Sequence, residues 1–255
     1  MPAIALRGAE TVPGKSGSPD HAASRKPGDD SGRQRAFFGR RKGHPLKARQ
    51  ASLVETLLPK LALDLTKPAP PDLATLFGGV DATRLEIGFG GAEHLIAEAK
   101  ANARTGFIGS DGYINATAKA LSAIDAERLD NIRLHSGDAS ALLDWLPAAA
   151  LSRVDLLYPD PWPKRRHWKR RFIQDHSLKR LARILKPGGE LRFATDIAEY
   201  AAYALARVLR SPDFVWTAED ADDWRKPWPG FSGTRYEAKA KREGRVPAYF
   251  IFQKI

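Results

Sequence analysis

The chain has 255 residues, no cysteine and a formal net charge of +11 from 41 basic and 30 acidic side chains. A hydrophobic fraction of 43% over this length suffices for one α/β domain with a buried core, and it excludes a collagen-like or wholly disordered chain. The absence of cysteine excludes disulfide scaffolds, thiol nucleophiles and thiolate zinc sites. No apolar run approaches the ~18 residues of a membrane span and no secretory signal is recognisable. We therefore expect a cytoplasmic protein that binds neither a membrane nor a metal.

The positive charge is concentrated in three segments. Residues 163–186 carry ten lysines and arginines against one aspartate, residues 35–50 carry six basic side chains and no acid, and residues 233–245 carry five against two acids. Aromatic residues are interleaved with these charges. A single basic run is often only a solvated helix face or a localisation signal, but three such clusters favour contacts with nucleic acid.

Apolar periodicity predicts an alternating α/β chain after an N-terminal tail. Residues 1–34 show neither a strand nor a helix period, so we predict a flexible tail there and a single folded domain at 35–255. A helical segment at 45–65, bent or ended at Pro59, comes first. Strands are predicted at 83–87, 106–110, 131–135, 154–158, 190–195, 214–217 and 248–252, helices at 92–102, 114–128, 139–146, 169–185 and 197–210, and a loop at 222–233. This alternation favours a mostly parallel sheet covered on both faces.

A glycine turn joins the first of these strands to a helix. Gly88 and Gly90 allow a ligand to approach the backbone closely, so we expect both to contact a cofactor. The dinucleotide fingerprint requires a further glycine where Glu93 stands, and a carboxylate there would repel a pyrophosphate. The turn therefore favours a ligand without phosphates, unless it is an ordinary strand–helix connection.

Acidic residues stand at the carboxyl ends of three successive predicted strands, at Glu86, Asp111 and Asp138. Open α/β sheets bind ligands at this edge, and an acid after the second strand is placed to accept hydrogen bonds from ribose hydroxyls. The three acids favour a nucleoside with a positively charged tail, such as S-adenosylmethionine. For Asp138, capping of the following helix is the stronger alternative.

A Pro-Asp-Pro-Trp segment follows the fourth predicted strand. Pro159 and Pro161 restrict the backbone around Asp160, which holds one carboxylate rigidly beside Trp162. We interpret Asp160 as an acceptor for a purine edge that stabilises charge developing on the base. A merely stiff turn is the alternative.

The basic run directly after this segment is expected to bring phosphates to the same place. The predicted contacts with an RNA backbone are Arg165, Arg166, Lys169, Arg170 and Arg171. Two later motifs are weaker. Asp196 either caps the next helix or joins Asp160 at the substrate, and residues 234–237 combine a hydroxyl, a cation, an aromatic ring and a carboxylate before the last strand.

Taken together, these segments resemble the tRNA (guanine-N7)-methyltransferase family. The matching residues are 85–92, 107–115, 136–139, 158–164, 194–196 and 234–237, and the Pro-Asp-Pro-Trp segment with its arginine-rich continuation is the most specific of them. The resemblance implies an α/β class I methyltransferase fold with a Rossmann-like, doubly wound sheet of seven strands, the last antiparallel. It also implies methyl transfer from S-adenosylmethionine to N7 of a variable-loop guanosine in tRNA. No sequence feature requires another protein chain, so we expect a monomer or a homodimer.

The resemblance further implies residue roles. Cofactor contacts are expected from Glu86, Asp111, Asp138 and Asp160, with Asp160 also the catalytic residue, and substrate contacts from Lys164, Asp196, Thr234, Arg235, Tyr236 and Glu237. Two departures from the family pattern are Ala92, where a third glycine is common, and Asp111, where glutamate is commoner.

Three alternative functions stay open at this point. The main one is a non-catalytic RNA-binding protein on a methyltransferase fold. A nicotinamide-dependent oxidoreductase is disfavoured by Glu93 and by the basic segment after Asp160. Methyltransferases that act on exocyclic amino groups commonly have the order Asn/Asp-Pro-Pro-aromatic, whereas here the acid lies between the prolines.

Overall fold

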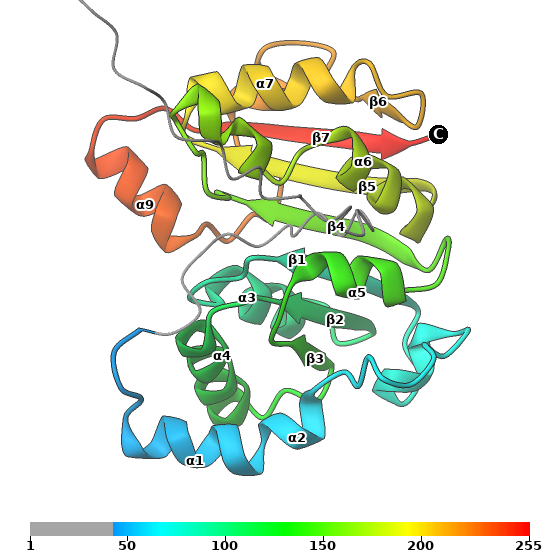
Figure 1. Ribbon diagram of the computed structural model, residues 1–255, viewed down its shortest axis with the longest axis vertical. Helices are drawn as coiled ribbons and strands as arrows, with labels where there is room; N and C mark the ends of the chain where they lie inside the picture. Colours follow the sequence, from blue (N-terminus) through cyan, green and yellow to red (C-terminus); the bar gives the residue numbers. More distant parts are fainter. Residues whose placement is uncertain (1–42) are drawn as a thin grey trace, which may run out of the picture. The chain divides into compact units, whose positions relative to one another are not determined.

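The computed structural model describes residues 43–255 (Figure 1), so the predicted tail at 1–34 and the start of the basic segment at 35–50 lie outside the described residues. Seven strands form one mixed sheet in the order β3-β2-β1-β4-β5-β7-β6. They are β1 (Ala82–Ile87), β2 (Thr105–Ser110), β3 (Ile132–His135), β4 (Leu151–Leu157), β5 (Leu185–Thr195), β6 (Phe214–Trp216) and β7 (Ala248–Lys254). The last strand, β7, runs opposite to the other six, which confirms the expected seven-stranded sheet with an antiparallel last strand.

Helices connect these strands. They are α1 (Ala48–Thr56), α2 (Leu58–Leu61), α3 (Glu93–Ala101), α4 (Ile114–Glu127), α5 (Ala139–Trp145), α6 (Asp175–Ile184), α7 (Ala198–Val208), α8 (Asp222–Arg225) and α9 (Arg235–Arg242), with 3-10 turns at Leu73–Phe77 and Arg165–Arg170. The predicted interruption near Pro59 is present, because α1 ends at Thr56, α2 begins at Leu58 and Pro59 lies in the first turn of α2. No helix within 43–255 is long and apolar enough to cross a bilayer.

Three local predictions are wrong. The helix expected at 169–185 begins only at Asp175, because the basic residues before it form a separate 3-10 turn and an extended segment. The strand expected at 190–195 begins already at Leu185, so the Pro-Gly-Gly sequence at 187–189 lies within β5, where the pairing with β4 shifts register. Residues 222–233 include the short α8, and the helix α9 that carries the 234–237 motif was not predicted.

The topology explains why distant segments meet. Strand order reverses between β1 and β4, and such a switch point leaves a crevice at the carboxyl ends of the strands. Strand β7 is antiparallel, so it must begin at this same edge, where Ala248 pairs with Thr195. Helix α9 directly precedes β7 and is therefore delivered to the edge at which β1, β2 and β4 end (Figure 1).

Candidate functional site

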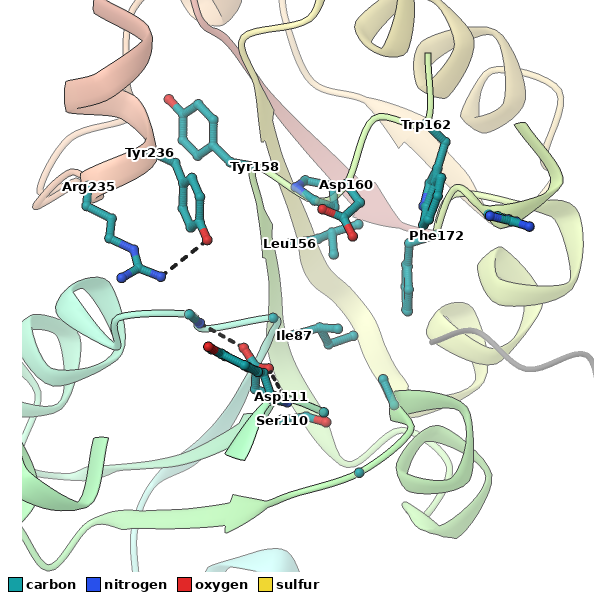
Figure 2. A pocket seen from close by; sticks show the side chains of 18 residues that line it. Ile87, Ser110, Asp111, Leu156, Tyr158, Asp160, Trp162, Phe172, Arg235 and Tyr236 are labelled. Carbon is teal, nitrogen blue, oxygen red and sulfur yellow. Dashed lines mark hydrogen bonds between the residues drawn. The ribbon is translucent and has the colours of Figure 1, made fainter. Parts of the chain in front are cut away.

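A cavity of about 330 Å³ opens at this edge, within the size range of small-molecule sites (Figure 2). Its lining comes from the ends of β1, β2 and β4, from the loop after β4 and from the start of α9. Two carboxylates, Asp111 and Asp160, and two guanidinium groups, Arg170 and Arg235, contribute to the lining.

The glycine turn after β1 forms one wall of the cavity. Gly88 and Gly90 both have left-handed backbones, with φ of 75° and 53°, which glycine adopts without steric cost. A Cβ added at Gly88 would meet nothing within 4 Å, so the backbone there borders open space. Ala92 has φ of 66° and is fully buried, so alanine adopts here a conformation that costs it roughly 1–2 kcal/mol.

Asp111, directly after β2, is fixed by main-chain donors. Its Oδ2 accepts from the Gly90 N–H at 2.9 Å and its Oδ1 from the Tyr113 N–H at 2.8 Å. Burial raises the pKa of Asp111 even though these two N–H groups favour the ionised form. The adjacent Ser110 hydroxyl is buried, lines the cavity and has no hydrogen-bond partner within the described part of the chain.

Asp160 is presented from the opposite wall by the Pro-Asp-Pro-Trp loop. Tyr158 and Trp162, which flank this Pro-Asp-Pro sequence, have φ of 50° and 43°. Left-handed backbones at non-glycine residues cost on the order of 1–3 kcal/mol each and persist only where the surroundings enforce them. Figure 2 shows the Asp160 carboxylate directed into the cavity, and loss of surrounding water raises its pKa.

The basic run divides into exposed and internal residues. Lys164, which precedes the 3-10 turn, is exposed, and so are Arg165, Arg166 and Lys169. Arg170 lines the cavity with its guanidinium carbon 4.9 Å from the centroid of the Trp162 ring.

Arg171 is only 2% exposed and donates to the carbonyl oxygen of Pro161 at 2.7 Å. Its predicted contact with an RNA backbone is therefore wrong, because a guanidinium enclosed by protein cannot reach a phosphate.

Two acids predicted to bind the cofactor do not line the cavity. Glu86 is buried, and its Oε2 lies 2.8 Å from Nδ1 of His94. Burial raises the pKa of Glu86. For His94 burial is the largest single effect and acts downward, but the charge and hydrogen bond of Glu86, together with nearby carboxylates, outweigh it and raise the pKa. Asp138 caps α5 by accepting from the Ser140 N–H at 2.9 Å, the alternative already stated for it. Its neighbours Gly137 and Ala139 line the cavity.

The predicted substrate motif is split by the first turn of α9. Arg235 and Tyr236 line the cavity, next to Gly90. Thr234 caps the helix by accepting from the Glu237 N–H at 3.0 Å, and the buried Glu237 carboxylate accepts from the Tyr249 hydroxyl at 2.7 Å.

Asp196 accepts from Nε of Arg245 at 2.6 Å and does not line the cavity. Of the two late motifs, the structure thus brings only Arg235 and Tyr236 to the lining.

The lining residues that were not predicted as site residues include Ser110, Tyr113, Tyr158 and Phe172. Ser110 could have been predicted, because it is a polar residue at the carboxyl end of β2, a strand that is buried throughout. Phe172 had none, because its position depends on the unforeseen break between the 3-10 turn and α6.

Comparisons with known proteins give the relatives of this chain. Residues 81–249 match the family model described as "Putative methyltransferase". The chain is 59% identical over 223 residues to a tRNA (guanine-N(7)-)-methyltransferase of Rhodopseudomonas palustris strain BisB5, covering 87% of each chain. It is 57% identical over 238 residues to a protein of the same name from Nitrobacter hamburgensis, covering 93% of this chain and 92% of the relative.

Among solved structures, the 16S rRNA methyltransferase KamB aligns with a TM-score of 0.53 and 13% sequence identity, over 74% of this chain and 94% of that one. At this identity the likeness concerns the fold alone. The fold is that of the class I methyltransferases, as the sequence resemblance implied.

Proposed function

The chain belongs to the family of tRNA (guanine-N7)-methyltransferases, and from this premise we propose that it transfers a methyl group from S-adenosylmethionine to N7 of a variable-loop guanosine in tRNA. One observation carries the proposal: Asp160 projects into a cavity that also contains the glycine turn, while exposed arginines follow it in the chain. The acid, the cofactor turn and a phosphate-binding surface thus meet at one edge of the sheet.

The lining fits S-adenosylmethionine, which supplies a methyl group activated on a sulfonium centre. Asp111 and Asp160 suit a ligand that carries positive charge, and Asp111 is placed to accept from ribose hydroxyls. Ser110 offers a buried hydroxyl in need of a partner, and the turn at Gly88 leaves room for a ligand against the backbone. A phosphate at this turn is disfavoured because Glu93 opens helix α3.

Methyl transfer to guanine N7 requires no proton transfer by a residue of the protein. Guanine N7 bears an in-plane lone pair and no hydrogen, so no general base is required, and the product ring is cationic. Asp160 accepts hydrogen bonds from the guanine edge and offsets the positive charge that develops on the base. The loop around Asp160 and the aromatic ring of Trp162 restrict the orientation of the base, which contributes to alignment of the reacting atoms.

The exposed basic residues contribute binding energy. N7 lies on an edge that is inaccessible in the deep groove of A-form RNA, so the target base must leave its stack at a cost of a few kcal/mol. The 3-10 turn that follows the catalytic loop (the Pro-Asp-Pro-Trp loop that carries Asp160) bears Arg165, Arg166 and Lys169. Contacts of these residues with phosphates offset this cost.

Incubation with bulk tRNA and S-adenosylmethionine, followed by analysis of the nucleosides, tests the proposal. We expect 7-methylguanosine as the product. Methylation of an exocyclic amino group would contradict the assignment of the target atom. Binding of tRNA without methyl transfer would instead support the non-catalytic alternative.

We also propose that the protein acts in the cytoplasm as a monomer or homodimer and that residues 1–34 are dispensable for catalysis. Deletion of these residues is expected to leave turnover within about twofold of the full chain, because all proposed site residues follow residue 85. Loss of turnover on deletion would assign the segment a part in the reaction.

A further inference from the structure

A buried arginine lies behind the loop that carries Asp160. The side chain of Arg171 has no exposed surface, and its guanidinium carbon lies 4.6 Å from the ring centroid of Trp168, 4.9 Å from that of Tyr200 and 4.7 Å from that of Tyr203. Aromatic faces attract a cation most strongly where water is excluded. The guanidinium is therefore held in one place by three rings.

This guanidinium contacts the backbone of the catalytic loop. Its Nε donates to the carbonyl oxygen of Pro161 at 2.7 Å. That carbonyl belongs to the peptide bond between Pro161, which follows Asp160, and Trp162, whose φ is 43°. The two prolines have no N–H to donate, so the loop has fewer main-chain donors for anchoring and the carbonyl of Pro161 matters more. At the other end of the loop, the Tyr158 N–H donates to the carbonyl of Ala194 at 2.7 Å.

Helices α6 and α7 complete the surroundings of Arg171. Its Nη2 donates to Glu199 on α7. Gln174 donates from Nε2 to the carbonyls of Trp168, at 2.7 Å, and Arg171, at 3.2 Å, and it accepts from the Tyr203 hydroxyl. Each partner thus fixes either the guanidinium or the main chain that bears it.

We propose that Arg171 is a positioning residue for methyl transfer, which holds the carbonyl of Pro161 and thereby fixes Asp160 and Trp162 relative to the cavity, and that it contacts no RNA. The inference rests on the proposed function for the reaction that it serves. The planar guanidinium group of arginine donates hydrogen bonds in fixed directions and stacks on aromatic rings. The flexible ammonium group of lysine cannot replace it in both respects.

The decisive variant is Arg171→Lys, which keeps the positive charge and removes the planar guanidinium group. We expect kcat to fall about tenfold or more, while the KM for tRNA, the Kd for S-adenosylmethionine and the salt dependence of tRNA binding stay within twofold. The acid limb of the kcat profile is expected to move to lower pH, because a released Asp160 gains water. An unchanged kcat, or a weaker tRNA affinity with a salt slope reduced by about one unit, would overturn the inference.

Arg207→Lys is a matched control from the same aromatic cluster. The Arg207 guanidinium carbon lies 4.6 Å from the Tyr203 ring centroid, and its Nη1 donates to Asp175 at 2.6 Å. This variant perturbs the cluster without removing the bond to Pro161, so we expect its kcat to stay within twofold of wild type. An equal loss in both variants would assign the effect to general packing and overturn the inference.

If Arg171→Lys loses its cooperative thermal transition, Glu199→Gln tests the inference by the same criteria. This variant weakens the ion pair that holds Arg171, and it is expected to fold because the Glu199 side chain is half-exposed. About a threefold fall in kcat with an unchanged salt slope is then expected, and an unchanged kcat overturns the inference. Failure of the proposed function is distinguishable, since wild-type protein would then form no 7-methylguanosine.

Discussion

The two acids of the cavity are fixed in different ways. Asp111 is held through its carboxylate, because the N–H groups of Gly90 and Tyr113 each donate to one of its oxygens. Asp160 is held through its backbone, because two prolines, two left-handed neighbours and the anchored carbonyl of Pro161 restrict the chain around it. The first arrangement leaves an acceptor suited to a neutral hydroxyl. The second leaves a carboxylate directed into the cavity, suited to a base that becomes charged.

The largest effect that separates the two acids is expected for Asp160→Asn. In the proposed mechanism Asp160 offsets the charge that develops on the base, so its removal is expected to lower kcat by about 10²–10³-fold, the range seen when a transition-state contact of this kind is lost. The Kd for S-adenosylmethionine is expected to rise far less than kcat falls, because Asp111 stays in the lining. Single-turnover methyl transfer and calorimetric titration measure these two quantities. A kcat within threefold of wild type would remove Asp160 from the mechanism.

Asp111→Asn is expected to show the reverse pattern. The neutral amide loses a charge-assisted acceptor, worth roughly 1.5–3 kcal/mol, so the Kd for S-adenosylmethionine is expected to rise about 10- to 100-fold. At saturating cofactor, kcat is expected to stay within about threefold. If the variant instead binds the cofactor normally and turns over slowly, the division of roles between the two acids is wrong.

A smaller effect distinguishes the exposed basic residues from the buried Arg171. The double variant Arg165→Ala/Arg166→Ala is expected to weaken tRNA binding about tenfold at low salt and to reduce the log–log salt slope by one to two units. Exposed Lys100 and Arg104 lie before β2, away from the carboxyl ends of the strands, and their double alanine variant is the control. Equal losses in both double variants would indicate only a general effect of net charge.

The smallest effect concerns pH and stability. Burial raises the pKa of Asp160, so the carboxyl contributes stability while protonated, and this contribution is lost as pH rises through its pKa in the folded protein. Asp160→Asn is therefore expected to melt slightly above wild type at pH 7, and the difference is expected to vanish below the ordinary aspartate value of about 3.8. Wild-type kcat is expected to fall on acidification at a pH above that value. A melting temperature lower than wild type at pH 7 would contradict this account.

Much of the fold was predictable because it depends on local patterns. Apolar runs bounded by Gly and Pro located all seven strands, and most of the alternating helices were found within a few residues of their ends. The errors concern charged segments. Helix α9 is short and has few apolar residues, so it was not recognised. The basic run before α6 was merged with α6 because basic residues continue through both.

The candidate site was predictable where a residue directly follows a strand and faces the crevice, as with Asp111 and Asp160. It was not predictable where a side chain has a competing partner. Glu86 follows the same rule of position, yet its carboxylate lies against His94 from the next helix. Arg171 belongs to the same basic run as Arg165 and Arg166, so the sequence does not distinguish it from them. Packing against α6 and α7 places it inside the protein.

The amino-acid sequence alone determined the strand–helix alternation, the glycine turn and the proline-flanked acid, since each depends on the steric preferences of neighbouring residues. The tertiary structure decided which charged side chains are exposed to solvent, which line the cavity and which form ion pairs with one another. These outcomes depend on the sheet order and on the antiparallel course of β7, which join residues more than a hundred positions apart, as Gly90 and Tyr236 show. Local preferences carry no information on such pairings, because the energies that select them arise only once the elements pack.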